Sequence, residues 1–402
     1  MSLPPTVAEL ARAVTRRDRS LLDADLTEAH DRVVERVRGR HVLVVGGAGS
    51  IGSATAAQLL RFAPAALHIV DVDENGLTEL VRDLRSQGAV PVATELRTTP
   101  LDAGSPAMRR LLAASRYDLV LNFAAVKHVR SEKDALSLLR MLEVNVRMPR
   151  RLLEDVARVA ERYFAVSTDK AANPVNLMGA TKRAMEHVLL DEPLGPVVTS
   201  ARFANVAFSQ GSLLDGWLRR LAKRQPWAVP EATRRYFVSL EEAGQLCLLA
   251  STLGSAGQLV IPTLDPADHL RDLVEVATDV MGALGLTPQL HRDEQAARLA
   301  AENPKPGTWP LLVTPLDTAG EKEYEEFVAD GDAVHDLGFR ALQSVEPPRC
   351  DSATVHEVLQ EVGELLDDSE RPVDEDSIEA LVSRLVPELT HRRSDRTLDA
   401  RM

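Results

Sequence analysis

The middle of the chain holds a cluster of polar side chains that could move protons. In the segment FAVSTDKAANPVNLMGATKRAMEHVLL, residues 164–190, an apolar run delivers Thr168, Asp169 and Lys170 to its end. A neighbouring carboxyl and amine can act as general acid and base. For this the aspartate must be held protonated, and the lysine must be partly neutral through desolvation or a nearby cation. The alternative interpretation of the pair is an ordinary solvated turn.

A helix is predicted to follow this polar turn and to carry a second lysine. It begins near Met178 and includes Lys182, and because these positions differ by four residues they lie on one helix face. The thioether of Met178 cannot transfer a proton. Proton transfer in this segment is therefore expected from Asp169 and Lys170.

A glycine-rich turn near the start of the chain has the spacing of a dinucleotide-binding loop. The segment VLVVGGAGSIGSATAAQLL places Gly46, Gly49 and Gly52 at intervals of three between a predicted strand and a predicted helix. The first glycine allows a tight turn, the second lets backbone approach a pyrophosphate, and the third allows close helix packing. The helix N-terminus then faces the negative charge. A glycine-rich turn in an unrelated fold is the alternative.

Acidic residues after the second and third predicted strands indicate which nucleotide is bound. Asp71 ends the second strand, 19 residues after Gly52. A carboxylate there can accept hydrogen bonds from both hydroxyls of the adenosine ribose and repels a 2′-phosphate. Asp73 adds negative charge and no arginine follows directly, so NAD is predicted rather than NADP. Asp102 is a candidate adenine contact or, equally, the cap of a helix that begins near Ser105.

Strand and helix patterns alternate around these motifs. The predicted strands are 41–46, 67–72, 89–94, 117–125, 163–168 and 197–203. The predicted helices are 50–62, 76–87, 105–115, a long stretch reaching about residue 162, and 178–190. This alternation indicates an α/β fold of Rossmann type, a doubly wound parallel sheet with helices on both faces. Ligands bind such sheets at the carboxyl ends of the strands, where the motifs above fall.

The remaining segments are expected to form a smaller C-terminal substrate lobe and two helical appendages. Helical patterns cover 5–38, 212–224, 240–253, 268–284, 352–366 and 376–386, a strand covers 258–262, and the Pro-rich segment 286–345 is expected to be irregular. We predict a helical extension at 1–40, an NAD-binding Rossmann domain at 41–204 to which 236–262 returns, a nucleotide-sugar lobe at 205–235 and 263–345, and an acidic helical tail at 346–402.

Composition excludes several classes of protein. The 402 residues include 45% hydrophobic residues, which supports a buried core and excludes a wholly disordered chain. Cys247 and Cys350 are the only cysteines, so a disulfide scaffold and a zinc ribbon are excluded and no metal site is predicted. The first 20 residues lack an apolar run of the signal-peptide kind, and no apolar run of about 18 residues occurs. We therefore expect a cytoplasmic protein without a membrane partner.

Charge excludes nucleic acid as an expected partner. The formal net charge is −13, and no basic stripe with interleaved aromatic residues occurs. Residues 351–402 hold 14 acidic and 6 basic side chains, so more than half of the net negative charge lies in the last segment. We interpret this tail as helices with a solvated acidic face.

With four further segments, the catalytic stretch resembles a known enzyme family. These segments are NFAAVKHV (122–129), ARFANVAFSQGS (201–212), RYFVSLEEAGQL (235–246) and AGEKEYEEF (319–327). Together they resemble extended short-chain dehydrogenase/reductases, and among these the bacterial UDP-N-acetylglucosamine 4,6-dehydratases of polysaccharide and antibiotic sugar pathways. The resemblance covers residues 41–335, and STDKAANPVN…MGATK is its most specific block. Many short-chain dehydrogenases have tyrosine where this chain has Met178, but methionine is a variant found in that family.

The resemblance implies a reaction and a role for each residue of the catalytic stretch. The family oxidises carbon 4 of the sugar by hydride transfer to NAD, removes water across carbons 5 and 6, and returns the hydride to carbon 6. Carried over to this chain, Lys170 is the base at carbon 5 and Asp169 the acid that protonates the departing hydroxyl. Thr168 binds the carbon 4 hydroxyl, and Lys182 binds the nicotinamide ribose. Met178 occupies the tyrosine position.

The predicted contacts extend over most of the matched segments. The cofactor contacts are Gly46, Gly49, Ser50, Ile51, Gly52, Asp71, Asp102, Ala124, Ala125 and Lys182. The substrate contacts are Lys127, His128, Asn173, Asn205, Arg235 and Glu321. A structural histidine is the equal alternative for His128. Two arginines usual in the family are missing, because Gln210 and Thr318 stand in their places, and Arg234 is the candidate to compensate for them.

Two other functions and one assembly question stay open. An enzyme of the same fold could end differently, as a 4-epimerase, a 5-epimerising dehydratase or a 5,6-dehydratase. A catalytically silent NAD-binding scaffold is the alternative from another class, favoured by Met178. A UDP-sugar is the expected substrate. Residues 1–40 have an amphipathic pattern with 8 basic and 7 acidic side chains, so we expect them to serve self-association in a homo-oligomer.

Overall fold

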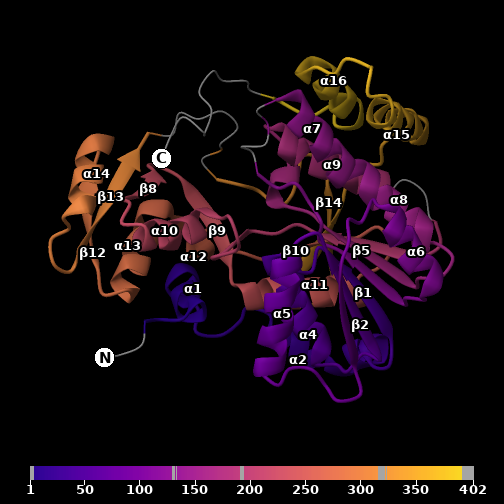
Figure 1. Ribbon diagram of the computed structural model, residues 1–402, viewed down its shortest axis with the longest axis horizontal. Helices are drawn as coiled ribbons and strands as arrows, with labels where there is room; N and C mark the ends of the chain where they lie inside the picture. Colours follow the sequence, from indigo (N-terminus) through magenta and orange to yellow (C-terminus); the bar gives the residue numbers. More distant parts are fainter. Residues whose placement is uncertain are drawn as a thin grey trace.

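The computed structural model describes residues 4–128, 132, 134–190, 194–315, 322 and 324–391. Its centre is a nine-stranded sheet with helices on both faces (Figure 1). The strands are β1 (His41–Val45), β2 (Ala66–Asp71), β3 (Glu95–Pro100), β4 (Leu119–Asn122), β5 (Arg162–Val166), β6 (Val197–Ala201), β10 (Leu259–Pro262), β14 (Ala333–Asp336) and β15 (Leu342–Glu346). Their order is β14-β15-β10-β6-β5-β4-β1-β2-β3, parallel from β10 to β3 with β15 and β14 antiparallel. The predicted Rossmann-type fold is confirmed.

Helices bury both faces of this sheet because successive side chains of its strands point in opposite directions. In β1, Val42 and Val44 pack on one face, whereas Leu43 and Val45 pack on the other. The first face is covered by α3 (His30–Val37), α4 (Ser50–Leu60), α5 (Glu74–Ser86) and α11 (Leu240–Leu253). The second is covered by α6 (Pro106–Ala114), α8 (Met148–Val156) and α9 (Leu177–Leu190). The near-continuous apolar runs of the central strands follow from this double covering.

The third strand is not where the sequence predicted it. The segment 89–94 forms a turn, and β3 follows it at Glu95–Pro100. Val92, which supported the prediction, is fully exposed, and Pro91 has no N–H to give to a strand ladder. Because β3 is an edge strand with half-exposed side chains, its sequence ELRTTP needs little apolar character.

The long helix predicted to reach residue 162 is two helices. They are α7 (Ala135–Leu142) and α8, joined by a π-helical turn at Glu143–Arg147. A π-helical turn adds a residue to the helix and is often found at functional sites. Here it places the buried Asn145 beneath the loop that follows β4.

The smaller lobe is more regular than the sequence suggested. It contains two three-stranded sheets, β11-β9-β7 and β12-β13-β8. Its elements are β7 (Asn205–Val206), α10 (Leu213–Ala222), β8 (Trp227–Pro230), β9 (Arg234–Val238), α12 (Pro266–His269), β11 (Leu270–Asp272), α13 (Leu273–Ala283), β12 (Thr287–His291), α14 (Glu294–Glu302) and β13 (Thr308–Thr314). Stacked Trp217 and Trp227, with ring centroids 5.0 Å apart, lie in its core. Figure 1 shows the lobe at the left of the large sheet.

Two predictions about this region are wrong. The segment 286–345 is not irregular, because it supplies β12, α14, β13, β14 and most of β15. The assignment of 263–345 to the lobe is also too long. The hairpin of β14 and β15 extends the large sheet, where β15 pairs with β10. Leu342 and Val345 of β15 are buried there.

The predicted helix over 5–38 is broken into α1 (Val7–Thr15), α2 (Asp23–Glu28) and α3. Arg16 has φ 53°, a left-handed conformation that ends α1. Apolar side chains of α1 pack in the lobe core, whereas those of α3 pack against the large sheet. These helices therefore join the two parts of the chain. Their apolar faces are occupied within one chain, and the predicted self-association stays a prediction.

The acidic tail packs on the second face of the molecule. Its helices are α15 (Ser352–Asp367) and α16 (Glu375–Leu385), which lie over α7 and α9 (Figure 1). Val355, Val358, Val362 and Leu381 are buried in this contact, and Glu357 and Glu375 are exposed. Among the described residues, no helix is both long and apolar enough to cross a membrane.

The first prediction concerns the contact of α2 with the loop between β14 and β15. Asp25 of α2 is 1% exposed, and its two carboxylate oxygens accept hydrogen bonds from the N–H groups of Arg340 and Ala341, at 2.7 and 2.9 Å. Asp25→Ala leaves both N–H groups without their partner, so we expect a loss of about 1–3 kcal/mol in the free energy of unfolding. Denaturant unfolding measures it. The exposed Asp18→Asn is the control, and equal stability of the two variants would contradict this account.

Candidate active site

The glycine loop has the geometry that a dinucleotide requires. Gly46 has φ 75°, and a Cβ there would lie 2.5 Å from the backbone nitrogen of Ala124. A Cβ on Gly52 would lie 2.4 Å from the carbonyl oxygen of Gly46. At Gly49 the nearest atom to such a Cβ is the carbonyl oxygen of Gly46 at 3.4 Å, an ordinary van der Waals distance. Gly46 and Gly52 are therefore required by the close packing of the turn, whereas the role of Gly49 in binding a pyrophosphate stays a prediction.

No side chain caps the N-terminus of α4. Its N-cap is Gly49, which offers no side chain to the first N–H groups, and Ser50 and Ile51 begin the helix. Ser50 Oγ accepts a hydrogen bond of 2.7 Å from the N–H of Gln210, which lies in a loop of the lobe. The uncapped first turn keeps its partial positive charge available for an anion.

The two acidic residues proposed for the adenosine side lie at strand ends. Asp71 at the end of β2 accepts from the N–H of Ala48 at 2.9 Å and of Asp73 at 3.0 Å, so it is fixed beside the glycine loop. Asp102 accepts from Gly104 N–H at 2.8 Å and pairs with Arg140 at 3.2 Å. It does not cap α6. Ser105 does, by accepting from the N–H of Met108, so that alternative for Asp102 is wrong.

The loop after β4 packs against the glycine turn and is held by Asn145. Ala124 touches the glycine turn, and Ala125 follows it. Asn145, which sequence reasoning missed, donates to the carbonyl of Val126 and accepts from its N–H, both at 2.9 Å. It also donates to Thr181 Oγ1 at 3.0 Å. Asn145 thus ties this loop to α9, and nothing in its sequence surroundings marks it beyond an amide in a helical pattern.

Lys127 and His128 contact the lobe loop that carries Gln210. Lys127 Nζ donates to the carbonyl of Gln210 at 2.8 Å. A Cβ on Gly211 would lie 2.9 Å from His128 Cε1, so the glycine makes room for the imidazole. These two predicted substrate contacts therefore lie where the large sheet and the lobe meet.

The turn predicted to be catalytic, residues 168–171, follows β5 and includes a short 3₁₀ helix, Asp169–Ala171. We refer to it as the catalytic turn. Asp169 is 2% exposed, and its Oδ1 accepts from Thr168 Oγ1 at 2.9 Å and from Lys170 Nζ at 3.1 Å. Its Oδ2 is buried and has no hydrogen-bond partner within the described part of the chain. An unpaired buried carboxylate oxygen is costly, so it indicates a place for a proton or a ligand group. The structure brings the predicted acid and base into direct contact.

Lys170 lies between two carboxylates rather than one. Glu325, which sequence reasoning did not single out, places Oε1 at 3.9 Å from Lys170 Nζ. Burial lowers the pKa of Lys170, but Asp169 and Glu325 outweigh it and hold the pKa above its ordinary value. The partly neutral lysine expected from the sequence is therefore wrong for the protein without substrate, because two buried carboxylates stabilise the ammonium. Burial raises the pKa of Glu325, and Lys170 opposes this only in part.

Met178 and Lys182 lie on α9, both almost completely buried. Glu132 accepts hydrogen bonds from the N–H of Leu177 at 3.2 Å and of Met178 at 2.8 Å, and so caps this helix. Lys182 Nζ contacts Met185 Sδ at 3.2 Å. Burial lowers the pKa of Lys182 to about 8, with Glu186 acting in the other direction. A thioether is a weak partner for an amine, which leaves Lys182 able to donate to a bound group.

The predicted substrate contacts on the far side of the turn meet a segment of the lobe. Asn173, with φ 46°, accepts from Asp330 N–H at 3.0 Å, and its carbonyl accepts from Lys322 Nζ at 2.7 Å. Arg235 donates to the carbonyl of Lys322 at 3.0 Å, and its charge acts on both Lys170 and Glu325. Asn205 donates to the carbonyl of Tyr236 at 3.3 Å. Glu321 lies outside the described residues.

A network of buried ion pairs is hydrogen-bonded to Ser167, the residue before the catalytic turn. Arg202 at the end of β6 pairs with Glu186 of α9 at 2.7 Å and with Asp332 at 2.6 Å, and Arg183 joins both acids. Ser167, the residue before Thr168, donates to Glu186 at 2.6 Å. The sequence shows these residues only as charges in helix and loop patterns, so their pairing could not be predicted.

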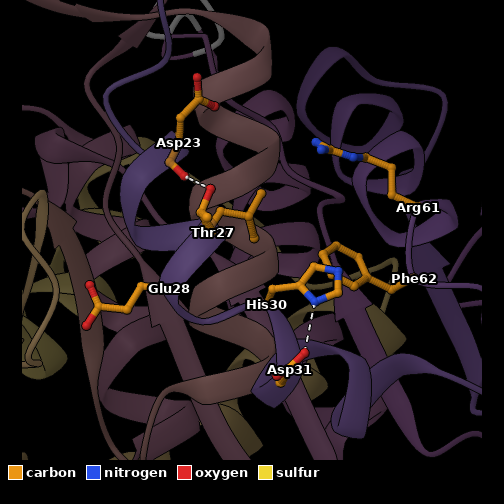
Figure 2. A pocket seen from close by; sticks show the side chains of 8 residues that line it. Asp23, Thr27, Glu28, His30, Asp31, Arg61 and Phe62 are labelled. Carbon is orange, nitrogen blue, oxygen red and sulfur yellow. Dashed lines mark hydrogen bonds and ion pairs between the residues drawn. The ribbon is translucent and has the colours of Figure 1, made fainter.

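A surface hollow elsewhere on the molecule holds none of the predicted site residues. It is formed by α2, α3 and the end of α4, and Figure 2 shows the side chains that line it. His30 lies against Phe62 with ring centroids 5.5 Å apart and contacts Asp31 at 3.2 Å. The catalytic turn, by contrast, lies at the carboxyl end of β5, so the hollow is a separate feature.

Three relatives are similar to this chain over its central part. A protein of Methanocaldococcus jannaschii named as an uncharacterized membrane protein is 32% identical over 250 residues, which are 60% of this chain and 72% of that protein. The probable polysaccharide biosynthesis protein EpsC of Bacillus subtilis is 27% identical, and the match covers 64% of this chain but only 43% of that longer protein. A UDP-N-acetylglucosamine 4,6-dehydratase (inverting) of Campylobacter jejuni is 27% identical over 56% of this chain and 67% of its own length.

Fold and family comparisons agree with the resemblance in the sequence. The X-ray structure of Pen from Bacillus thuringiensis superposes with a TM-score of 0.62 at 19% identity, covering 78% of this chain and 91% of that one. This shows a shared fold. A family model described as polysaccharide biosynthesis protein matches residues 42–346, which include the glycine loop, the catalytic turn and the lobe. The chain therefore belongs to the polysaccharide biosynthesis protein family.

Proposed function

We propose that this chain is an NAD-dependent nucleotide-sugar 4,6-dehydratase, with UDP-N-acetylglucosamine as the first substrate to test. The observation that carries the proposal is the direct contact of Asp169 and Lys170 at the end of β5, with their charged atoms 3.1 Å apart. A dehydratase needs an acid and a base close together, and this turn supplies both. The name and the 27% identity of the Campylobacter jejuni relative support the same reaction.

The residues present fit NAD. Gly49 brings no side chain to the uncapped N-terminus of α4, where a pyrophosphate would be held. Asp71 at the end of β2 would bind the adenosine ribose, and Lys182 the nicotinamide ribose. When bound, NAD would supply hydride transfer, accepting hydride from carbon 4 of the sugar and returning it to carbon 6.

The chain's own side chains would handle the protons. Thr168 would bind the carbon 4 hydroxyl, and its own hydroxyl already donates to Asp169 Oδ1. Lys170 Nζ would take the proton of carbon 5, which a ketone at carbon 4 makes acidic. Asp169 would protonate the hydroxyl that leaves carbon 6 as water. Its second oxygen, buried and without a partner in the described residues, is the candidate atom to carry that proton.

The substrate lobe would hold the nucleotide. Lys127, His128 and Arg235 are the candidates for the diphosphate and the sugar, because they lie where the lobe meets the large sheet. Arg234, whose guanidinium stacks on Tyr324 with 5.7 Å to the ring centroid, is the further cation next to them. In this proposal, Arg234 would compensate for the arginines that the usual family pattern has at positions 210 and 318.

The reaction is tested by incubating the purified protein with UDP-, TDP- and GDP-sugars and following products by mass spectrometry and NMR. A 4,6-dehydratase gives a product that lacks one water and has a methyl group at carbon 5. A product of unchanged mass would instead identify an epimerase, and a dehydrated product with a carbon 5–carbon 6 double bond a 5,6-dehydratase. If every sugar stays unchanged while NAD binds, the chain is a silent NAD-binding scaffold.

The cofactor preference gives the next prediction. We expect NAD to bind more tightly than NADP, because a 2′-phosphate would meet the Asp71 carboxylate beside Asp73. Asp71→Ala should weaken NAD and reduce the discrimination between the two, and calorimetry measures both affinities. The exposed Asp83→Asn in α5 is the control. Tighter NADP binding by the unchanged protein would refute the assignment of Asp71.

The division of roles in the catalytic stretch gives a further prediction. Lys170→Ala and Asp169→Asn should each lower turnover by about 10²–10⁴-fold while NAD still binds, because they transfer protons and do not hold the cofactor. Met178→Leu should cost far less, since an apolar side chain of similar volume replaces the thioether in a buried place. Exchange of deuterium from carbon 5 should slow in the Lys170 variant. If Met178→Leu is as damaging as Lys170→Ala, the roles are assigned wrongly.

A further inference from the structure

Glu325 is a buried carboxylate to which the proposed mechanism gives no role. Its side chain is 5% exposed, and it comes from the lobe segment that follows Lys322, not from the catalytic turn. Lys170 Nζ lies 3.9 Å from Glu325 Oε1 and 3.1 Å from Asp169 Oδ1. The lysine is therefore held from two sides by acids of separate parts of the chain.

The charges around Glu325 come from three segments. Asp169 and Lys170 face it from the catalytic turn, Arg235 from β9, and Lys322 from its own segment. Two buried carboxylates thus share the nearest ammonium, and Asp169 Oδ2 has no hydrogen-bond partner among the described residues. A buried carboxylate oxygen without a partner is unfavourable. Because the groups of this cluster interact closely, they titrate together, and a proton can move from one member to another.

One proton shared between Asp169 and Lys170 is enough for the first to act as an acid and the second as a base. An ammonium beside an ionised Asp169 and a neutral amine beside a protonated Asp169 contain the same number of protons. Moving one proton along the 3.1 Å contact converts the first pair into the second. Because only this transfer is needed, the raised pKa of Lys170 is compatible with its role as a base.

We propose that Glu325 is a positioning residue for this acid–base pair, an inference that rests on the proposed dehydratase function. It holds Lys170 Nζ in place and stabilises the ammonium formed in the elimination. In that step the carbon 5–hydrogen bond breaks, its proton passes to Lys170 and its electron pair forms the carbon 5–carbon 6 double bond. The carbon 6–oxygen bond breaks, and the proton of Asp169 leaves with the hydroxyl as water.

The test compares Glu325→Gln with Glu325→Asp. Gln keeps the shape of the side chain but removes its charge. We expect kcat to fall by about 10- to 10²-fold, which is no more than the smallest effect typical of a general acid or base, and KM to change little. Loss of a negative charge lowers the pKa of Lys170, so both limbs of the pH profile of kcat should move to lower pH. Asp keeps the charge and should keep the profile, with an intermediate kcat.

A matched control and a readout without substrate complete the experiment. Asp330→Asn, an exposed change in the same segment, should behave as wild type, and thermal unfolding checks that all variants fold. Acetylation of Lys170 by acetic anhydride, followed by mass spectrometry, should be faster in Glu325→Gln because more of the amine is neutral. Unchanged kcat, pH profile and acetylation in Glu325→Gln would overturn the proposal. Altered acetylation in a protein that dehydrates no sugar would overturn the proposed function and leave the positioning of Lys170 intact.

Discussion

The ion pair of Glu186 and Arg202 is inaccessible to solvent, and the geometry of the candidate site depends on it. Burial acts to raise the pKa of Glu186, but Arg202, Arg183 and Ser167 lower it to about 2, so the carboxylate stays ionised at neutral and mildly acidic pH. Each of these charges is stable in the interior only because its partners are present. Removing one member of a buried pair typically costs about 3–5 kcal/mol, which makes the network a strict constraint on the surrounding backbone.

That network positions both halves of the acid–base cluster. Ser167 donates to Glu186, and the next residues of the chain are Thr168, Asp169 and Lys170. On the opposite side, Arg202 binds Asp332 and the carbonyl of Phe327, so it fixes the lobe segment that carries Glu325. One buried arginine therefore determines how closely the turn and the lobe carboxylate approach. Side chains of a proton-transfer site need such rigid support, because small displacements separate donor from acceptor.

Sequence patterns were sufficient for the parts of the site that a single segment encodes. The glycine loop, Asp71 and the catalytic turn each sit at a strand end, and the alternation of strands and helices places those ends on one edge of the sheet. Glu325, Asn145 and Asp332 could not be identified in this way. Each acts across a contact with a distant segment, and locally each is an ordinary polar residue in a loop or helix. The position of the edge strand β3 was not predicted either, because a half-exposed strand needs no apolar pattern in its sequence.

The methionine at position 178 fits a site that separates proton chemistry from cofactor binding. On α9, Met178 is buried and cannot ionise, and the Lys182 amine contacts the sulfur of Met185. The titratable groups of the proposed elimination are instead gathered at the catalytic turn, where Lys170 lies between Asp169 and Glu325. A tyrosine at position 178 would add an ionisable hydroxyl to α9, which the proposed proton transfers do not use. In the proposed mechanism the protons are handled at the turn, so position 178 would only have to fill its buried space, and an apolar side chain does so without the cost of a buried hydroxyl.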